Sequence, residues 1–405
     1  ISFESKVGGI MEVICNQEYI KLAVSSDLHL LSKSLYDDGK AFSRMYYNSD
    51  GKQTKNGEKL IDEMFFEVQQ QQLDALVLTG DLALNGELVS HKELIEKLKM
   101  VKQNGVPVFV LPGNHDIGHP NARGYRGDDT YEVPSINEVQ FKELYYEFGY
   151  AQACSIDSAS LSYVVPLSTK TWLFCLDNCV RVEEKPLRYG ELREETFVWL
   201  EENLKKARKY GAYPLVAGHY NLAYHNLIFR ESFTMRNHER VSMLLKKYET
   251  SLFLSGHIHM QHMEQKSGIM DIATSSPCTY PHQYGILTIE DGKHIIYQTQ
   301  QIMISQKMRA DYRKFYYNNF IRQVFKKLEG ADEIPDVVKL EMSVYAAQLN
   351  MYYFSGDFYE ICDEIKNAHG WKLWEQYGEN IAFFTYLKSI LHDSMRNHNI
   401  YVQKG

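Results

Sequence analysis

The chain has 405 residues, of which 44% are hydrophobic and 24% are charged, and its formal net charge at pH 7 is −8. This composition is ordinary for a globular protein, and the length predicts one large domain with a smaller domain attached. No apolar run reaches the roughly 18 residues that a membrane-spanning helix needs, so we expect no membrane span. The net negative charge disfavours the broad basic surface that binds nucleic-acid polymers.

Strands and helices alternate between residues 20 and 303, after a polar and irregular N-terminal extension of residues 1–19. Apolar residues at helical spacing predict helices at residues 56–72, 88–103, 136–148 and 192–210. Strands of a second sheet are expected at residues 162–167, 171–176, 269–274, 284–289 and 294–298. This alternation predicts a largely parallel first sheet with helical cover, and hence an α/β domain built as a four-layer α/β/β/α sandwich.

The character of the chain changes after residue 303, where we expect a helical C-terminal domain, residues 304–405, to begin. Helices rich in Tyr and Phe are expected at residues 305–329, 335–353, 357–368 and 380–396. Aromatic residues such as Phe315 and Tyr316 are expected to form a core against the sandwich. A cap and a dimerisation surface are the alternatives, and the second leaves a homo-oligomer open.

Five short apolar runs in the first domain each lead into residues that commonly bind metals. They are residues 22–26 before Asp27 and His29, 75–79 before Asp81, 108–112 before Asn114 and His115, 214–217 before His219, and 251–255 before His257 and His259. An apolar run of about five residues bounded by turn signals predicts a buried strand. Ligands in open α/β sheets collect beyond the carboxyl ends of the strands. The runs therefore predict one polar, metal-loaded site.

Seven side chains in these motifs offer nitrogen or oxygen donors. They are Asp27, His29, Asp81, Asn114, His219, His257 and His259. A mononuclear site rarely uses more than about four protein ligands, so this set suits two metals that share a carboxylate. Asp81 is the expected bridge, because its strand should lie between the other contributors. A pair of metals about 3.5–4 Å apart can activate a bridging water and clamp both oxygens of an in-line displacement, as phosphoester hydrolysis requires.

Two residues of the third motif are candidates for the chemistry itself. His115 is left without a metal and is expected to act as the general acid that protonates the departing alkoxide. Asn114 is expected to bind one metal and also to face the phosphate. Both expectations come from their position inside the motif.

In chain order, the motifs Asp-x-His, Gly-Asp, Gly-Asn-His-Asp, Gly-His and Gly-His-x-His resemble those of the calcineurin-like metallophosphoesterase superfamily. They are most similar to bacterial class III cyclic-nucleotide phosphodiesterases with an appended C-terminal helical domain. The resemblance implies the same layered sandwich. It also implies that Asp27, His29 and His259 hold one ion. A second ion is then held by Asn114, His219 and His257. The ions would be divalent or trivalent manganese, iron or zinc, with availability deciding among them.

Two departures from related subfamilies narrow the resemblance. Purple acid phosphatases carry a tyrosine where this chain has Leu84, so a tyrosinate–iron centre is not expected. Protein Ser/Thr phosphatases continue Gly-Asp into a segment with a phosphate-binding Arg, whereas residues 80–87 contain no Arg. Protein phosphatase activity is therefore disfavoured.

The expected function is a binuclear metal-dependent phosphodiesterase for a small phosphoester substrate, with a cyclic nucleotide suggested by the resemblance alone. A hydroxide that bridges the metals would attack phosphorus in line, and His115 would protonate the leaving group. A phosphomonoesterase or nucleotidase on the same site is one alternative. A non-catalytic binding protein that uses its helical domain for a partner is another.

Polar residues outside the motifs carry weaker signals. His225 and His282 suit a donor behind a metal ligand, a substrate contact or an ordinary loop position, and these alternatives stay open. Residues 177–178 close a predicted strand and are expected to be structural, while His91 and His398 are expected at the surface.

The compartment is left open by the sequence. The chain starts at Ile1, which fits a secreted or cell-envelope protein after leader removal, and equally a trimmed cytoplasmic protein. The 6 cysteines form no close Cys-x-x-Cys pair, so a Cys-type zinc site is not expected.

Overall fold

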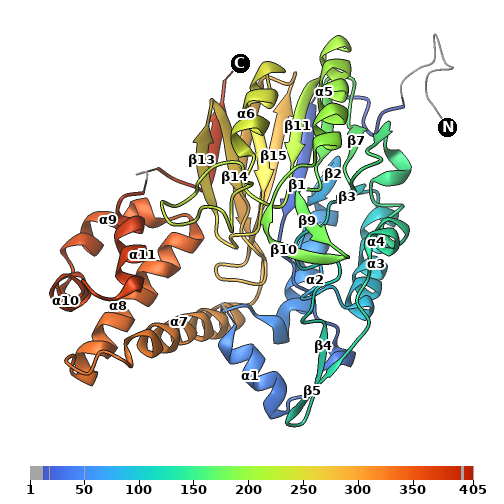
Figure 1. The fold of residues 1–405 in the computed structure, drawn as a ribbon. Helices are drawn as coiled ribbons and strands as arrows, with labels where there is room; N and C mark the ends of the chain where they lie inside the picture. Colours follow the sequence, from blue (N-terminus) through green and yellow to red (C-terminus); the bar gives the residue numbers. More distant parts are fainter. Residues whose placement is uncertain (1–11, 18, 50, 394–395, 405) are drawn as a thin grey trace.

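The computed structural model describes residues 12–404 except for residues 18, 50, 394 and 395 (Figure 1). Two mixed β-sheets form the body of the protein, and a group of C-terminal helices lies beside them (Figure 1). The predicted α/β class and the helical C-terminal region are confirmed. Residues 1–11 and 18 of the predicted N-terminal extension lie outside the described residues.

The first sheet has the strand order β17-β16-β15-β1-β2-β3. Its strands are β1 (Tyr19–Ser25), β2 (Ala75–Leu78), β3 (Val108–Val110), β15 (Gln283–Glu290), β16 (His294–Gln301) and β17 (Ile400–Gln403). The strands β1, β2 and β3 run parallel, whereas β15 pairs antiparallel with β1. The carboxyl ends of β1, β2 and β3 therefore lie at one edge of the sheet.

The second sheet has the strand order β13-β14-β12-β11-β8-β7-β6. Its strands are β6 (Ser155–Ile156), β7 (Tyr163–Pro166), β8 (Thr171–Cys175), β11 (Tyr213–Ala217), β12 (Leu252–Ser255), β13 (His262–Lys266) and β14 (Ile269–Ala273). Strands β8, β11, β12 and β14 run parallel to one another. Two hairpins stand apart from the sheets: β4 (Arg123–Arg126) with β5 (Asp129–Glu132), and β9 (Cys179–Val182) with β10 (Lys185–Gly190).

Helices cover the outer faces of the sandwich and build the C-terminal region. The covering helices and those near the site are α1 (Lys40–Asn48), α2 (Gly57–Gln70), α3 (Leu88–Gln103), α4 (Glu138–Leu144), α5 (Glu194–Lys209) and α6 (His238–Lys247). The C-terminal helices are α7 (Gln306–Leu328), α8 (Asp336–Ser355), α9 (Phe358–Asn367), α10 (His369–Tyr377) and α11 (Ala382–Leu391). Among the described residues, none of these helices combines the length and apolar character needed to cross a membrane.

Strand β1 shows why the central strands are apolar along their whole length. Leu22 and Val24 point into the layer between the two sheets, while Ala23 points to the opposite face against the helices. Successive side chains of a strand alternate between its two faces, and here both faces are buried. A continuous apolar run is therefore what this position in the fold requires.

The sheet membership expected from the sequence is wrong for two strands. Residues 284–289 and 294–298 were expected in the second sheet, but β15 and β16 extend the first sheet beside β1. The site-bearing strands β11 and β12 belong instead to the second sheet. Strand β15 is buried along most of its length and β16 alternates between exposed and buried residues, and neither pattern indicates which strand lies beside it.

Several elements were not expected from the sequence. Helix α1 lies between β1 and α2, in a segment for which no element was expected, and Ala41, Phe42 and Tyr46 are buried. Helix α6 follows a long loop, and strand β17 returns from the helical region to pair with β16. The last described residues thus rejoin the first sheet and do not end among helices.

Two histidines expected at the surface are buried. His91 lies on α3 and bonds the Tyr145 hydroxyl and the Asp116 carbonyl through its two ring nitrogens. His398 lies before β17, and its Nδ1 accepts a hydrogen bond from the backbone N–H of Met263. Both ring nitrogens of His91 and Nδ1 of His398 thus have partners inside the protein, which a single sequence does not reveal.

Candidate metal centre

All five motifs meet at one edge of the sandwich, although they come from two sheets. The turns after β1, β2 and β12 are tight, because five of the expected ligands have a left-handed backbone. Their φ angles are 56° at Asp27, 45° at His29, 52° at Asp81, 70° at His257 and 59° at His259. Non-glycine residues rarely adopt positive φ, and strained positions of this kind cluster at functional sites.

The first donor group contains Asp27, His29, Asp81 and His259, whose candidate ligand atoms all lie within 4.8 Å of one another. The Nε2 atoms of His29 and His259 are 2.9 Å apart. The same Nε2 of His259 lies 3.3 Å from Asp27 Oδ1, and His29 Nε2 lies 3.7 Å from Asp81 Oδ2. Three of these four residues are buried.

The second donor group contains Asp81, His219 and His257, again with ligand atoms within 4.8 Å. His219 Nε2 lies 3.5 Å from Asp81 Oδ1 and 3.2 Å from His257 Nδ1. The side-chain oxygen of Asn114 lies 3.0 Å from the same His219 nitrogen. Asp81 thus turns one oxygen toward each group, which is the geometry that a bridging carboxylate needs.

The hydrogen bonds behind the histidines determine which ring nitrogens face the site. His219 Nδ1 lies 2.9 Å from the Thr79 carbonyl, and His257 Nε2 lies 2.8 Å from the Ser232 carbonyl. A carbonyl only accepts, so each of these nitrogens carries the proton. The opposite nitrogens, Nε2 of His219 and Nδ1 of His257, therefore keep the lone pair that binds a metal.

The charges of the cluster are strongly coupled. Burial alone would raise the pKa of Asp81, but the neighbouring His219 and His115 hold it well below its usual range. Burial would lower the pKa of His219, whereas Asp81 raises it to about 9. Burial together with the nearby His219 lowers the pKa of His257 to about 3. Asp81 is therefore ionised and His257 unprotonated, the states in which each can bind a cation, whereas His219 would release its Nε2 proton when it binds one.

The donor set fits a metal centre on two further observations. Asp27 Oδ1, which faces the donor group, is buried and has no hydrogen-bond partner among the described residues. Mixed carboxylate, imidazole and amide donors are the ligands that first-row transition metals accept. The seven residues expected from the sequence are therefore brought together in an arrangement suited to two cations that share Asp81.

His115 stands beside this cluster but outside both donor groups. Its Nδ1 lies 2.9 Å from the Leu84 carbonyl and 3.0 Å from Asn85 Oδ1, so Nδ1 carries a proton. Its ring is edge-on to His29, with centroids 5.1 Å apart, and stacks on His119 at 4.5 Å. Its Nε2 has no hydrogen-bond partner among the described residues and remains for a bound substrate.

Two polar side chains hold the ligand-bearing turns from behind. Asp116 accepts hydrogen bonds from the backbone N–H groups of Leu82, Ala83 and Gly113, at 2.8, 3.0 and 2.7 Å. Asn178 accepts from the backbone N–H of His219 at 3.1 Å, in keeping with its expected structural role. The position of Asp116 inside its motif was the only sequence signal for this function.

Gly113, the glycine of the third motif, lies against the carboxylate of Asp81. A Cβ atom on Gly113 would lie 2.1 Å from Oδ1 of Asp81. Any side chain there would displace the carboxylate that faces both donor groups. Glycine is the residue that permits this approach of backbone to ligand.

His225 and His282, for which several roles stayed open, have structural contacts. His225 Nδ1 lies 3.0 Å from His262 Nδ1, and its Nε2 lies 3.1 Å from the Asp271 carboxylate. His282 Nδ1 lies 2.9 Å from the Pro277 carbonyl. Among the described residues, neither histidine bonds one of the seven donors.

A second cluster of metal-binding residue types contains His262, Asp393 and His398. The rings of His262 and His398 stack, with 3.9 Å between centroids and 23° between planes. In-plane lone pairs of stacked rings run side by side and do not converge on one ion. His398 Nδ1 also accepts the Met263 N–H, which leaves the proton on Nε2. This cluster is better explained as a hydrogen-bonded link between the C-terminal segment and β13.

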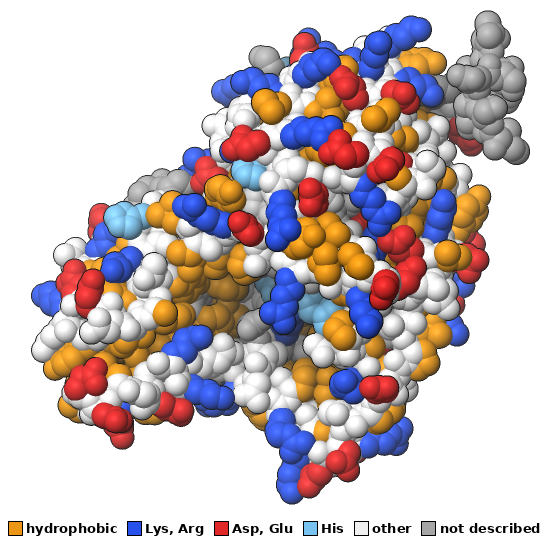
Figure 2. All heavy atoms as spheres, viewed as in Figure 1, with side chains coloured by type: hydrophobic (Ala, Val, Ile, Leu, Met, Phe, Trp, Pro, Cys, Tyr) orange, Lys and Arg blue, Asp and Glu red, His pale blue; other side chains and the backbone are white. Residues whose placement is uncertain are grey.

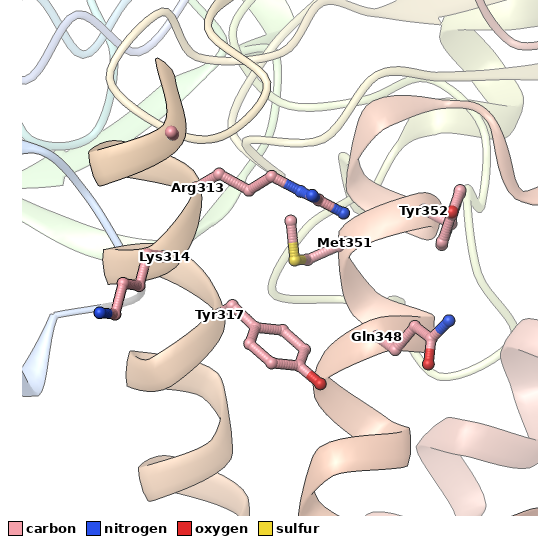
Figure 3. A pocket seen from close by; sticks show the side chains of 7 residues that line it. Arg313, Lys314, Tyr317, Gln348, Met351 and Tyr352 are labelled. Atoms are coloured by element: carbon pink, nitrogen blue, oxygen red, sulfur yellow. The ribbon is translucent and has the colours of Figure 1, made fainter. Parts of the chain in front are cut away.

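The surface is hollowed where the C-terminal helices meet the sandwich (Figure 2). Figure 2 shows an apolar-lined hollow there, with basic side chains and histidine at its margin. A groove of about 460 Å³ lies between α7 and α8. Its walls are formed by Ala310, Arg313, Lys314, Tyr317, Gln348, Met351 and Tyr352, of which Tyr317 and Met351 point between the helices (Figure 3). None of the seven donors lines this groove.

Comparison with protein families gives two matches. A profile described as calcineurin-like phosphoesterase matches residues 20–261, and the C-terminal domain of cyclic nucleotide phosphodiesterase matches residues 309–397. Because the first match covers more than half of the chain, the protein belongs to the calcineurin-like phosphoesterase family. Members of this family are metal-dependent phosphoesterases with a binuclear metal centre, as the motifs implied.

Individual relatives agree with this assignment. A probable glycerophosphodiester phosphodiesterase from Arcobacter nitrofigilis is 26% identical over 227 residues, which are 54% of this chain and 68% of the relative. A 3′,5′-cyclic adenosine monophosphate phosphodiesterase from Haemophilus influenzae is 26% identical over 215 residues, 52% of this chain and 65% of the relative. The structure of a dimetal phosphatase from Danio rerio shares the fold, with TM-score 0.50 and 12% identity over 70% of this chain and 96% of that chain.

Proposed function

We propose that this member of the calcineurin-like phosphoesterase family hydrolyses a small phosphodiester, with a cyclic nucleotide as the first candidate. The observation that carries the proposal is the pair of donor groups that share Asp81 and stand beside the free Nε2 of His115. The named relatives from Arcobacter nitrofigilis and Haemophilus influenzae are both phosphodiesterases by name. Their printed substrates differ, so the phosphodiester bond is the shared chemistry.

The two donor groups would each hold one metal ion. One ion would take Asp27, His29 and His259, the other Asn114, His219 and His257, and both would share Asp81. Manganese, iron and zinc all suit these nitrogen and oxygen donors. When bound, such a pair lowers the pKa of a water between the ions and offsets the charge of the phosphoryl oxygens.

The protein's own groups complete the site. Asn114 turns its carbonyl oxygen toward His219, so its amide N–H donors remain for a phosphoryl oxygen of the substrate. His115 is fixed by bonds at Nδ1, which directs Nε2 to the departing oxygen. In its imidazolium form His115 carries a proton on each ring nitrogen, and transfer of the Nε2 proton would neutralise the alkoxide as the ester bond breaks and leave a neutral ring with its proton on Nδ1.

The proposal is tested with the purified chain loaded with manganese. Initial rates on bis-p-nitrophenyl phosphate, p-nitrophenyl phosphate and 3′,5′-cyclic adenosine monophosphate are compared, with metal content measured on the same samples. Faster cleavage of the diesters would support the proposal. Faster cleavage of the monoester would replace it with a phosphatase or nucleotidase, and no cleavage by fully loaded protein would favour a binding protein.

A further inference from the structure

The loop between α1 and α2 reaches the metal centre, although its sequence contains none of the motifs. The backbone N–H of Gln53 donates to the Cys278 carbonyl at 2.7 Å. The Cys278 thiol donates in turn to the carbonyl of Leu28 at 2.9 Å. Leu28 stands between the two donors Asp27 and His29, so Cys278 links this loop to the ligand-bearing turn.

Lys52 is the cation that this loop carries toward the centre. It is half-buried, between the buried residues Gly51 and Gln53. Burial lowers the pKa of His29, and the nearby Lys52 ammonium lowers it further. The pKa of His115 is lowered mainly by burial, and the Lys52 ammonium lowers it further. Its charge is therefore felt both at a metal donor and at the expected general acid.

Lys52 has no anionic partner within the described part of the chain. Other lysines nearby are paired: Lys33 lies 2.7 Å from a Glu58 carboxylate oxygen, and Lys55 forms an ion pair with Asp38. A charge withdrawn from water is stabilised by an opposite charge beside it. Metal ions bound at the centre would repel the Lys52 ammonium, because like charges repel. An anion bound at the centre is the partner that would offset this repulsion.

The C-terminal domain fixes the loop that carries Lys52. From α7, Asn319 Nδ2 and Gln323 Nε2 both donate to the Ser49 carbonyl at 2.6 Å. A Cβ on Gly51, whose φ is +81°, would lie 2.4 Å from the ring of Tyr316. Helix α7 thus packs so closely on this loop that only glycine fits at position 51. This packing and the two hydrogen bonds hold the backbone next to Lys52 in place.

We propose that Lys52 binds a non-bridging oxygen of the substrate phosphoryl group, and that α7 holds the loop in place for this contact. The inference rests on the proposed function and adds a phosphate-binding side chain to it. An ammonium–phosphate contact is a charge-assisted hydrogen bond, among the stronger polar contacts in proteins. In this proposal the helical domain supports substrate binding at the metal centre, although it contributes no metal ligand.

The test uses inorganic phosphate as the probe, because phosphate binding does not depend on which ester is the substrate. Calorimetric titration of manganese-loaded wild type, Lys52→Met and Lys52→Arg is compared with Lys55→Met, a control from the same loop. We expect Lys52→Met to weaken phosphate binding by about tenfold or more. Lys52→Arg should lose less phosphate affinity than Lys52→Met, and the phosphate affinity of Lys55→Met should lie within about twofold of wild type. Metal content should be equal in all four proteins.

The outcomes separate this inference from the proposed function. Equal phosphate affinity in Lys52→Met and Lys55→Met overturns the role of Lys52, as does loss of metal from Lys52→Met alone. Absence of phosphate binding to loaded wild type overturns it too. One result would separate the two proposals. If the wild type cleaves no phosphoester but binds phosphate more tightly than Lys52→Met does, the phosphate contact stands while the proposed function fails.

Discussion

Replacing His115 with Ala tests the mechanism most directly, because the structure separates its side chain from the metal centre. The backbone N–H of residue 115 donates to Asp81 at 2.8 Å, and this bond survives the substitution. We therefore expect metal content to stay at the wild-type level. The substitution removes only the imidazole ring, whose Nδ1 is hydrogen-bonded to the Leu84 carbonyl and to Asn85 Oδ1.

The size of the effect should depend on the leaving group. General acid catalysis contributes about 10²–10⁴-fold where a poor leaving group must be protonated. Hydrolysis of an alkyl phosphodiester by His115→Ala should fall by about this factor. Cleavage of bis-p-nitrophenyl phosphate should fall by less than about tenfold, since p-nitrophenolate departs without a proton.

A matched control comes from the residue that orients the ring. Asn85→Ala removes one acceptor at Nδ1 but leaves the Leu84 carbonyl, so we expect less than about a tenfold loss, the scale of one hydrogen bond. Initial rates for both substrates and metal analysis of each variant provide the measurement. Equal losses for good and poor leaving groups would refute the general-acid assignment of His115.

Further predictions concern the ligands, the supporting residues and the C-terminal contact. Asp81→Ala should lose both metals, whereas His257→Ala should lose mainly one; elemental analysis that finds two metals in Asp81→Ala would contradict a shared carboxylate. Chelation should abolish hydrolysis, and added manganese should restore it; activity that survives complete metal removal would reject a metal-dependent reaction. Asn178→Ala should lower the free energy of unfolding by about 1–3 kcal/mol, because it leaves buried backbone groups unbonded; an unchanged denaturation midpoint would argue against this. Gln323→Ala should raise KM severalfold with little change in kcat, compared with Lys326→Ala on the exposed face of α7; identical kinetics of the two variants would show that α7 does not hold the Lys52 loop.

The ligand residues could be predicted from the sequence because each follows its strand within a few positions. Asp27 and His219, for instance, each follow an apolar run directly or after one or two small residues. In such cases the strand and its ligand are neighbours in the sequence, so a short motif identifies both. Only the convergence of the strand ends at one edge has to be assumed. Which sheet each strand joins could not be predicted in this way, since β11 is buried throughout and β15 over most of its length, and burial alone does not identify the neighbouring strand.

Residues that act through tertiary contacts gave no such signal. His91 and His398 were expected at the surface, yet each is satisfied by bonds to residues distant in the chain. Helix α1 was not predicted, and only Ala41, Phe42 and Tyr46 of its residues are buried. Its packing partner Phe315, which stacks on Tyr46 at 4.4 Å, lies on α7 in the other domain.

The same reasoning explains why Lys52 is invisible to motif analysis and why the helical domain matters to a centre that it does not ligate. Its loop gains a fixed position only when α7 bonds the Ser49 carbonyl and packs on Gly51. A catalytic sandwich without α7 would keep all seven donors but would leave this cation on an unsupported loop. The metals would then still bind, whereas the phosphate would lose a contact. Variation in the helical domain is thus expected to change substrate affinity more than metal content, because these two properties depend on different contacts.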